Sequence, residues 1–428
     1  MNESMPHGMS ALDRASAAPT GSGETDVAIV GAGLAGSIAA AVLGRAGYRV
    51  ALIDRHAVPP AQFRVEKVVG EQVHLLDRLG LLPALAGAAK FFDEVLNVHR
   101  GRVVDRTHSP HYGIFYHDLV KVMRSQLPPS VTFVVGHAVD LNTGPQRQSL
   151  TLANGRVIES KLIILATGMN GALRHKLGVP LRVAFEKQSV SFGFNIVSAS
   201  ANGFEFPAMT YYGEKWADRI DYLSLFPVDN AMRANLFTFR DPHDEWIRDM
   251  RRSPKETLLG ALPGLERFLG DFRIVSKVES WVMDLCTTDS CRRDGVVLIG
   301  DAFQTSCPAT GMGVSRLLTD VDRLCNVHLP RWFETAGMGA AKVARFYEDP
   351  WKRAADARAR HLSAYHRSLV LEPGMGWGMR RGQLNLRRRI KVRIYRLSPG
   401  LLSRVQGIMR GLRSRSAPNP VREKYSCP

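Results

Sequence analysis

The stretch DVAIVGAGLAGSIAAAVLGRAGYRVALIDRH, residues 26–56, decides the fold of this chain. Its apolar run 27–30 predicts a strand, the alanine-rich run 34–46 predicts a helix, and the run 50–53 predicts a second strand that ends at Asp54. Three glycines in the spacing GxGxxG lie between the first strand and the helix. A strand, turn, helix and strand in this order predict a turn that binds the diphosphate of a dinucleotide.

Each glycine of the turn has its own steric role. Gly31 can take the backbone angles of the turn, Gly33 lets the chain touch a pyrophosphate, and Gly36 lets the helix pack closely on the strand. Asp54 lies 18 residues after Gly36, where a carboxylate can accept hydrogen bonds from the 2′-hydroxyl of a ribose. A glycine-rich turn without a ligand is the alternative, and the ordered elements with their terminal acid favour the dinucleotide site.

The composition is typical of a globular protein. The chain has 428 residues, of which 45% are hydrophobic and 23% charged, which suits about two domains. No apolar run reaches the roughly 18 residues of a membrane span, and residues 1–25 lack the pattern of a signal peptide, so we predict a disordered leader there. The five cysteines are widely spaced without a CxxC pair, which predicts neither disulfides nor a metal site and favours a reducing cytoplasm.

Basic residues gather at the C-terminal end of the chain. The net charge is +17, and residues 373–428 hold 14 Lys or Arg against one acid, Glu423. Apolar residues alternate with arginine at near-helical spacing, which favours an interfacial helix on anionic lipid, peripheral to the inner membrane face. A solvated helix packed on the first domain is the alternative. Nucleic-acid binding ranks third, since no recognisable module accompanies the charge.

A β-rich segment after the first unit ends in a second turn of small residues. Asn154-Gly155 predicts a hairpin, and the apolar run 162–165 predicts a buried strand. Thr167 and Gly168 follow that strand directly. Small residues at this place predict a second close approach to the same ligand.

A third block follows far downstream. The apolar run 296–299 predicts a buried strand that ends at Asp301, and a loop then leads into a helix predicted from about residue 314. The loop residues with special geometry are Pro308, Gly311 and Gly313. Asp301 can contact a ribityl or pyrophosphate group, and the helix N-terminus offers backbone N–H groups to an electron-rich ligand.

Residues 182–282, between these blocks, alternate apolar and polar side chains and are rich in aromatic residues. Such alternation predicts an antiparallel sheet with one covered face. We expect this sheet to roof a pocket and to form the substrate domain. For any single aromatic residue, a purely structural place in the core is the commoner outcome.

The GxGxxG turn with Asp54, LATGMNGALRHKLG (165–178) and GDAFQTSCPATGMGVSRLLTDV (300–321) together resemble the FAD-dependent monooxygenases of the p-hydroxybenzoate hydroxylase type, the group A flavoprotein monooxygenases. The resemblance covers about residues 26–370. It implies an α/β fold with a Rossmann-like FAD-binding domain, an inserted antiparallel-sheet substrate domain and a helical C-terminal region. The expected bounds are 26–181 with 283–330, 182–282, and 331–428, with the basic tail from about 373.

The resemblance implies FAD bound in an extended pose. The residues implied to bind it are Gly31, Gly33, Leu34, Ala35, Gly36, Asp54, Arg55, Arg64, Thr167, Gly168, Asp301, Pro308, Gly311 and Gly313. The adenosine diphosphate is expected on 31–36, the ribityl chain near Asp301, and the flavin ring beside 308–313. Arg64 is expected near the diphosphate. No catalytic acid or base and no metal ligand is implied. His117 could deprotonate a phenol, but a lone histidine is more often structural.

The implied activity is hydroxylation or epoxidation of a hydrophobic aromatic or polyene molecule of secondary metabolism. Reduced FAD reacts with O₂ in this family to give a flavin C4a-hydroperoxide, which transfers one oxygen atom to the substrate. Thr167-Gly168 stands where the family usually has Asp-Gly. The reductant therefore stays open between transient NADH or NADPH and a separate flavin reductase.

Other activities of the same fold remain alternatives. The sequence Ala166-Thr167-Gly168 is similar to flavin-dependent halogenases and lycopene cyclases, although the WxWxIP block of halogenases is missing. A halogenase, an isoprenoid reductase or cyclase, and a non-catalytic flavin-binding protein therefore stay open. Halide dependence distinguishes a halogenase, and oxygen consumption distinguishes a monooxygenase from a reductase. The absence of any turnover with reduced flavin would favour a non-catalytic flavin-binding protein.

Overall fold

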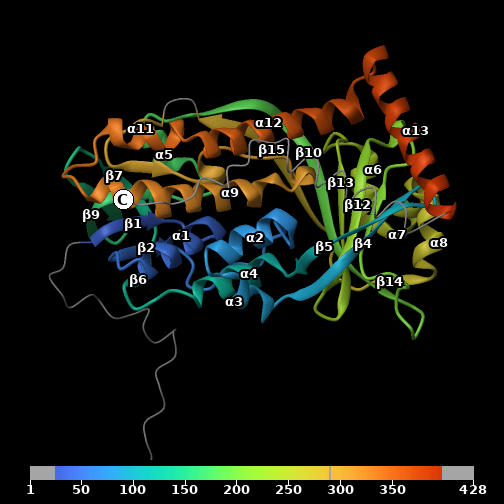
Figure 1. Ribbon diagram of the computed structural model, residues 1–428, viewed down its shortest axis with the longest axis horizontal. Coiled ribbons are helices and arrows are strands. Elements are labelled where there is room, and N and C mark those ends of the chain that lie inside the picture. The colour runs from blue at the N-terminus through green and yellow to red at the C-terminus, as the bar shows by residue number, and fades with distance from the viewer. Residues whose placement is uncertain (1–24, 289–290, 398–428) are drawn as a thin grey trace, which may run out of the picture.

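Two β-sheets and the helices packed on them make up residues 25–288 and 291–397, which the computed structural model describes (Figure 1). In Figure 1 the first sheet, with the N-terminal strands, lies at the left, and the second lies at the right. The paired strands β10 and β15 of the second sheet extend along the top toward the first sheet. The predicted leader, except for Thr25, and the part of the basic tail after residue 397 lie outside the described residues.

The first sheet has seven strands in the order β6-β2-β1-β9-β8-β7, with β16 paired to β9. The strands are β1 (Thr25–Val30), β2 (Val50–Asp54), β6 (Val131–Val135), β7 (Ala138–Asn142), β8 (Gln148–Leu152), β9 (Val157–Leu165) and β16 (Val296–Leu298). β6, β2, β1, β9 and β16 pair in parallel, while β7 and β8 are antiparallel additions. Since parallel strands end at one edge, Gly31, Asp54, Thr167 and Asp301 meet there.

Both faces of β1 are buried, and successive side chains of the strand point to opposite faces. Val27 and Ile29 pack against one layer of helices, and Ala28 and Val30 pack against residues of β7, β8 and a short helix, α5. The helices are α1 (Leu34–Arg45), α2 (Gly70–Arg78), α3 (Leu82–Ala86), α4 (Tyr116–Arg124), α9 (Met312–Arg323) and, on the other face, α5 (Ala172–Lys176). Burial on both faces explains the uninterrupted apolar run in the sequence.

The apolar residues Val73, Leu76, Leu79 and Leu82 recur at helical spacing, yet they are divided between two helices and the turn that joins them. α2 ends at Arg78 and α3 begins at Leu82. Gly80 between them has a φ of +67°, a left-handed conformation that ends a helix. The apolar spacing continues across the break because both helices contribute to the same core. The break is therefore not visible in the hydrophobic pattern.

The second sheet has nine strands in the order β14-β10-β13-β12-β11-β4-β5-β3, with β15 paired to β10. The strands are β3 (Lys67–Val69), β4 (Lys90–His99), β5 (Arg102–Gly113), β10 (Leu181–Ser198), β11 (Met209–Tyr212), β12 (Ile220–Val228), β13 (Ala231–Thr238), β14 (Phe272–Ile274) and β15 (Glu279–Thr288). Neighbours are antiparallel except β4 and β11. β3, β4 and β5 come from 67–113, a segment predicted to lie in the FAD-binding domain, and Leu96 and Val98 of β4 pack in the core of this sheet.

The second sheet has one apolar face and one mixed face. On β12, Leu223 and Leu225 are buried in a core with three helices: α6 (Glu245–Arg252), α7 (Pro254–Ala261) and α8 (Glu266–Leu269). Tyr222, Ser224 and Phe226, at the alternating positions, line a cavity instead. The predicted antiparallel sheet with one covered face is confirmed for these strands.

Further helices follow α9. They are α10 (Leu329–Phe333), α11 (Ala340–Glu348), α12 (Pro350–Leu371) and α13 (Met375–Leu397). α12 lies against α9 of the first domain, and α13 lies along β5 at the far end of the second sheet (Figure 1). The basic helix is therefore packed on the second sheet and not on the first domain.

Candidate functional site

A cavity of about 630 Å³ is lined by residues of both sheets. Of the residues predicted to bind the cofactor, these line it: Gly31, Gly33, Leu34, Ala35, Asp54, Arg55, Arg64, Thr167, Gly168, Asp301, Pro308, Gly311 and Gly313. Gly36 does not. The structure thus brings together segments that are more than 250 residues apart in the sequence. The contact of each residue with a cofactor stays a prediction.

Gly36 does not line the cavity, but it allows α1 to pack closely on the glycine turn. A Cβ atom on Gly36 would lie 1.9 Å from the carbonyl oxygen of Gly31. Gly31 itself has a φ of +99°, and a Cβ there would lie 2.5 Å from the carbonyl oxygen of Ala166 at the end of β9. These two glycines are therefore required by contacts within the protein, and they aim the first turn of α1 at the cavity.

Asp54 joins the glycine turn to the loop after β2. Its Oδ2 accepts a hydrogen bond from the backbone N–H of Ala32 at 2.7 Å, and its Oδ1 accepts one from the backbone N–H of His56 at 2.8 Å. Both bonds fix the carboxylate at the carboxyl edge of the sheet, where it lines the cavity. Each carboxylate oxygen can accept a further bond, so the predicted contact with a ribose is compatible with this geometry.

Arg124, which the sequence reasoning missed, clamps the same region. Its guanidinium donates to the carbonyl oxygen of Ala32 at 2.7 and 3.0 Å, and to those of His56 and Ala57 at 3.2 and 3.0 Å. The guanidinium also lies 5.0 Å from the ring centre of Phe133. In the sequence, Arg124 looks like an ordinary basic residue in the last turn of an amphipathic helix, so nothing distinguished it.

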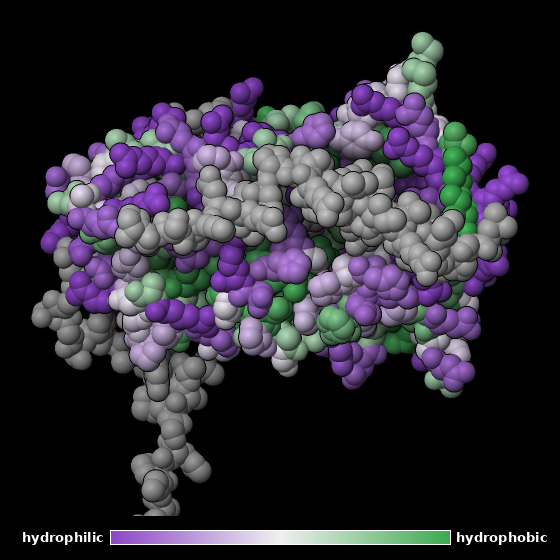
Figure 2. All heavy atoms as spheres, viewed as in Figure 1, coloured by the Kyte–Doolittle hydropathy of each residue, from purple (hydrophilic) through white to green (hydrophobic). Residues whose placement is uncertain are grey.

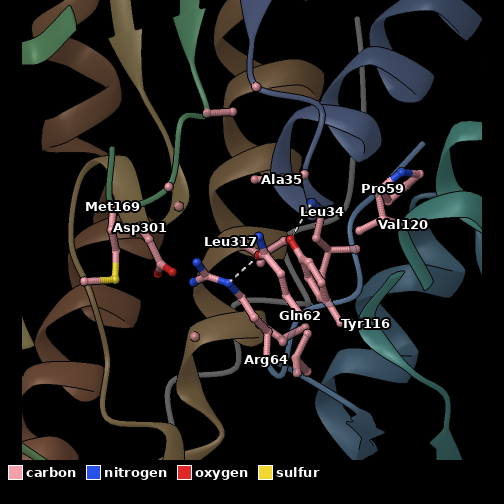
Figure 3. Close-up of a pocket in the computed structure, with 18 of the residues that line it drawn as sticks. Leu34, Ala35, Pro59, Gln62, Arg64, Tyr116, Val120, Met169, Asp301 and Leu317 are labelled. Carbon is pink, nitrogen blue, oxygen red and sulfur yellow. Dashed lines mark hydrogen bonds between the residues drawn. The ribbon is translucent and has the colours of Figure 1, made fainter. Parts of the chain in front are cut away.

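Tyr116, and not His117, faces the cavity from the start of α4 (Figure 3). The Tyr116 hydroxyl accepts a hydrogen bond from the backbone N–H of Leu34 at 3.4 Å, and burial raises its pKa. His117 lies 3.3 Å from Asp118 and stacks on Phe115. His117 is absent from the cavity lining, so the structure gives it no position for deprotonating a bound phenol.

Arg64 and Asp301 approach the cavity from opposite sides (Figure 3). Arg64 donates to Gln62 at 3.2 Å and lies 4.3 Å from the ring centre of Trp281. Burial raises the pKa of Asp301, and the positive charges of Arg316 and Arg64 oppose that rise. Among the described residues no hydrogen bond to the Asp301 carboxylate is found, so it is an available acceptor at the cavity surface.

Buried charges hold the turn that carries Asp301. Asp320 accepts a hydrogen bond from the backbone N–H of Gly300 at 2.9 Å, and Arg316 donates to the Gly300 carbonyl at 3.0 Å. Lys352 of α12 completes the cluster with contacts of 2.8 Å to Asp320 and 3.1 Å to Asp356. Since each buried charge has an opposite charge beside it, the cluster can fix the turn without leaving a bare ion.

The second sheet presents aromatic side chains to the cavity. The apolar lining residues from its strands are Val69, Tyr222, Phe226, Phe237, Trp281 and Met283. The Tyr222 hydroxyl donates to the carbonyl oxygen of Ala309 at 2.7 Å, which ties the sheet to the 308–313 loop. These aromatic residues, for which a structural place was the commoner expectation, form a wall of the cavity.

Similarity to known proteins covers most of the chain. The family described as "FAD binding domain" matches residues 24–327. Kynurenine 3-monooxygenase of Salinispora arenicola is 23% identical over 352 residues, which are 74% of this chain and 76% of that protein. Ubiquinone hydroxylase UbiM of Neisseria meningitidis is 21% identical over 347 residues, 76% of this chain and 73% of that protein.

Solved structures share the fold. The p-nitrophenol 4-monooxygenase PnpA from Pseudomonas putida DLL-E4 has a TM-score of 0.68 at 16% identity, covering 89% of this chain and 96% of that chain. The flavin-dependent brominase Bmp2 has a TM-score of 0.62 at 16% identity, covering 86% of this chain and 92% of that chain. At such low identity these structures show the fold alone.

Proposed function

Since the chain belongs to the FAD binding domain family and is an FAD-dependent monooxygenase, we propose that it hydroxylates or epoxidises a hydrophobic aromatic or polyene molecule. One observation carries this proposal. A single cavity extends from the glycine turn and Asp54 to the aromatic wall of the second sheet. One part suits the cofactor, and the other suits a large apolar substrate.

The residues at the carboxyl edge of the first sheet fit FAD. The glycine turn leaves no Cβ between the backbone and a diphosphate, and the N–H groups of the first turn of a helix have no partners within the helix. Arg64 offers a positive charge, and the Asp301 carboxylate is an available acceptor for a hydroxyl of the ribityl chain. FAD, when bound, supplies the activation of O₂, which protein side chains do not provide.

The side chains of this protein position the substrate and exclude water. Phe226, Phe237 and Trp281 offer ring faces to an aromatic or conjugated molecule. Tyr222 holds the 308–313 loop against the sheet through its bond to Ala309, which closes the cavity beside the place expected for the flavin ring. The aromatic rings of this wall would keep water away from the reaction there.

Electrons are proposed to come from NADH or NADPH, bound transiently. Thr167 donates its hydroxyl hydrogen to the Asn170 carbonyl at 2.9 Å, so it shapes its own turn and carries no charge. Anaerobic addition of NADPH or NADH to the purified protein should bleach the flavin absorbance. A spectrum that stays oxidised with both would assign reduction to a separate flavin reductase.

Substrate-dependent oxygen consumption tests the activity. With reduced FAD, we expect at least one compound in a panel of apolar phenols, fused-ring acids and conjugated polyenes to raise O₂ uptake several-fold (about threefold or more) and to incorporate ¹⁸O from ¹⁸O₂. Uptake at background for the whole panel would count against a monooxygenase. A product that forms only with bromide or chloride would favour the halogenase alternative.

We also propose that α13 contacts an anionic membrane surface. Met375, Met379, Leu386 and Ile390 are exposed by 84, 61, 57 and 50%. Their spacing of i, i+4, i+11 and i+15 places them on one side of the helix. Figure 2 shows apolar surface at the upper right, where α13 lies in Figure 1. No helix within the described residues is long and apolar enough to span a membrane.

The opposite side of α13 is docked on the protein, which leaves the apolar stripe free for a partner. Arg388 lies 3.9 Å from the ring centre of Tyr212, and Lys391 lies 2.5 Å from Asp105. Arg389 and Arg393 are exposed near the stripe and can pair with lipid headgroups. An apolar stripe with basic neighbours suits the boundary between headgroups and acyl chains.

Replacing the four residues of the stripe by serine should abolish co-sedimentation with phosphatidylserine vesicles, because both apolar insertion and helix orientation are lost. Wild type should bind these vesicles and bind phosphatidylcholine vesicles weakly. The matched control is the pair Val157→Ser and Val275→Ser, which removes exposed apolar residues elsewhere and should leave sedimentation unchanged. Equal sedimentation of the stripe variant and wild type would rule out this contact.

A further inference from the structure

Lys67 of β3 is a cation on the cavity wall without an acidic partner. Its Nζ donates to the Ser224 hydroxyl at 2.7 Å and lies 5.3 Å from the ring centre of Phe226. No carboxylate within the described residues forms an ion pair with it. Removal from bulk water lowers the pKa of Lys67 to about 8. A sheltered ammonium group with two unused N–H donors is costly unless an anion binds it.

Arg233, which pairs with Phe226 in the sheet, differs from Lys67 because it has carboxylate partners. Arg233 donates to Glu66 at 2.7 and 2.9 Å and to Glu279 at 2.7 Å. Its charge is therefore neutralised within the fold. Lys67 has no such arrangement and faces the cavity instead.

Two buried polar atoms that line the same cavity as Lys67 also lack partners. Ser224 lies directly opposite Asn235 in the β12–β13 pair. The Asn235 Oδ1 atom and the Ser191 hydroxyl have no hydrogen-bond partner among the described residues, and these side chains are only 6 and 2% exposed. Both residues line the cavity. Since buried polar groups are nearly always hydrogen-bonded, these atoms point to a ligand with polar groups of its own.

We propose that Lys67 and Ser224 bind an ionised oxygen of the substrate, that Asn235 Oδ1 accepts a hydrogen bond from a neighbouring hydroxyl group, and that the Ser191 hydroxyl binds a further polar group of the same molecule. This assignment rests on the proposed function and specifies its substrate. The molecule is an apolar ring system or polyene that carries a phenolate, an enolate or a carboxylate. Its apolar body lies along Phe226 and the other rings of the wall.

The alternative is that Lys67 binds a phosphate of FAD. Its two contacts, Ser224 and Phe226, both belong to β12 of the second sheet. The glycine turn and Asp54 belong to the first sheet. Lys67 therefore lies with the substrate wall, and its replacement should leave FAD in place.

Titration of the FAD-containing protein with a matched pair of probes tests the subsite. Perturbation of the flavin absorbance reports binding of 2-naphthoate, which is anionic, and of 2-naphthamide, which has the same shape without charge. We expect wild type to bind 2-naphthoate at least about tenfold more tightly, in keeping with a charge-assisted hydrogen bond. Lys67→Met should remove this preference and leave the affinity for 2-naphthamide and the FAD content unchanged.

Two further variants keep the test independent of folding. Lys67→Arg retains the cation and should retain the preference for 2-naphthoate. Lys90→Met is the matched control. Lys67 and Lys90 both pair with Gly113 of β5, Lys67 from β3 on one side and Lys90 from β4 on the other. Unlike Lys67, Lys90 is exposed and does not line the cavity. Lys90→Met should bind both probes as wild type does.

Each outcome separates the subsite from the reaction. The subsite would be overturned if wild type shows no preference for 2-naphthoate, or if it binds neither probe. It would also be overturned if the Lys67→Met variant keeps the preference. Loss of FAD from Lys67→Met would instead assign Lys67 to the cofactor. Preference for 2-naphthoate with background O₂ uptake would support the subsite and contradict the monooxygenase activity.

Discussion

Gly36→Ala is expected to yield protein that purifies without FAD. The added methyl group would lie 1.9 Å from the carbonyl oxygen of Gly31, which is a backbone atom, so no side chain can rotate away to relieve the contact. The helix α1 must then move off β1 and take the glycine turn with it. Overpacking of this kind costs about 3 kcal/mol or more, which corresponds to a loss of about 100-fold or more in FAD affinity. The ratio of flavin to protein after gel filtration measures how much FAD the variant retains.

A matched glycine shows whether the effect is specific. Gly87 is exposed after α3, its φ is −72°, and the nearest atom to a new Cβ there would lie 3.6 Å away. Gly87→Ala should therefore keep wild-type FAD content and stability. If Gly36→Ala also retains stoichiometric FAD with unchanged affinity, the close contact between α1 and the turn is not what positions the cofactor.

Arg124→Met is expected to weaken FAD binding by about 10-fold to 100-fold, which matches the loss of one hydrogen bond from a charged group at about 1.5–3 kcal/mol. The substitution removes every bond that Arg124 makes to the carbonyl oxygens of Ala32, His56 and Ala57. The glycine turn and the loop after β2 then lose their common clamp. Arg124→Lys should be intermediate, because one ammonium group cannot reach all three carbonyls. Fluorescence quenching of added FAD gives the dissociation constants.

Lys121 supplies the control for Arg124. It lies one turn earlier on α4, its side chain is 51% exposed, and it contacts Asp118 on its own helix. Lys121→Met removes the same charge from the same helix without touching the glycine turn, so FAD affinity should not change. A loss of affinity equal to that of Arg124→Met would mean that net charge near the site, and not the clamp, is responsible.

Residues whose roles depend on their chain neighbours were predictable. Gly31 and Gly36 act within one turn, where a carbonyl and a Cα must approach each other, and only glycine allows that approach. Asp54 and Asp301 end apolar strands, and parallel strands place such ends at one edge. These local rules were enough to predict which segments would surround the cofactor.

Residues whose roles depend on how elements dock could not be predicted. Tyr116 and His117 are adjacent in the sequence, and only the orientation of α4 directs the tyrosine into the cavity. β3 joins the second sheet through β5, and that pairing places Lys67 beside Ser224, 157 residues later in the chain. Neither the hydrophobic pattern nor any motif carries this information.

By itself the sequence therefore determined the α/β fold, the FAD family and the backbone turns at the carboxyl edge of the first sheet, because each depends on spacing within a few residues. Tertiary structure alone decided the clamp at Arg124 and the polar group at Lys67, Ser224 and Asn235. Those side chains come from a helix and three strands that are far apart in the sequence and are brought together only by the tertiary fold. Their contacts arise from packing over long sequence separations, which no local pattern records.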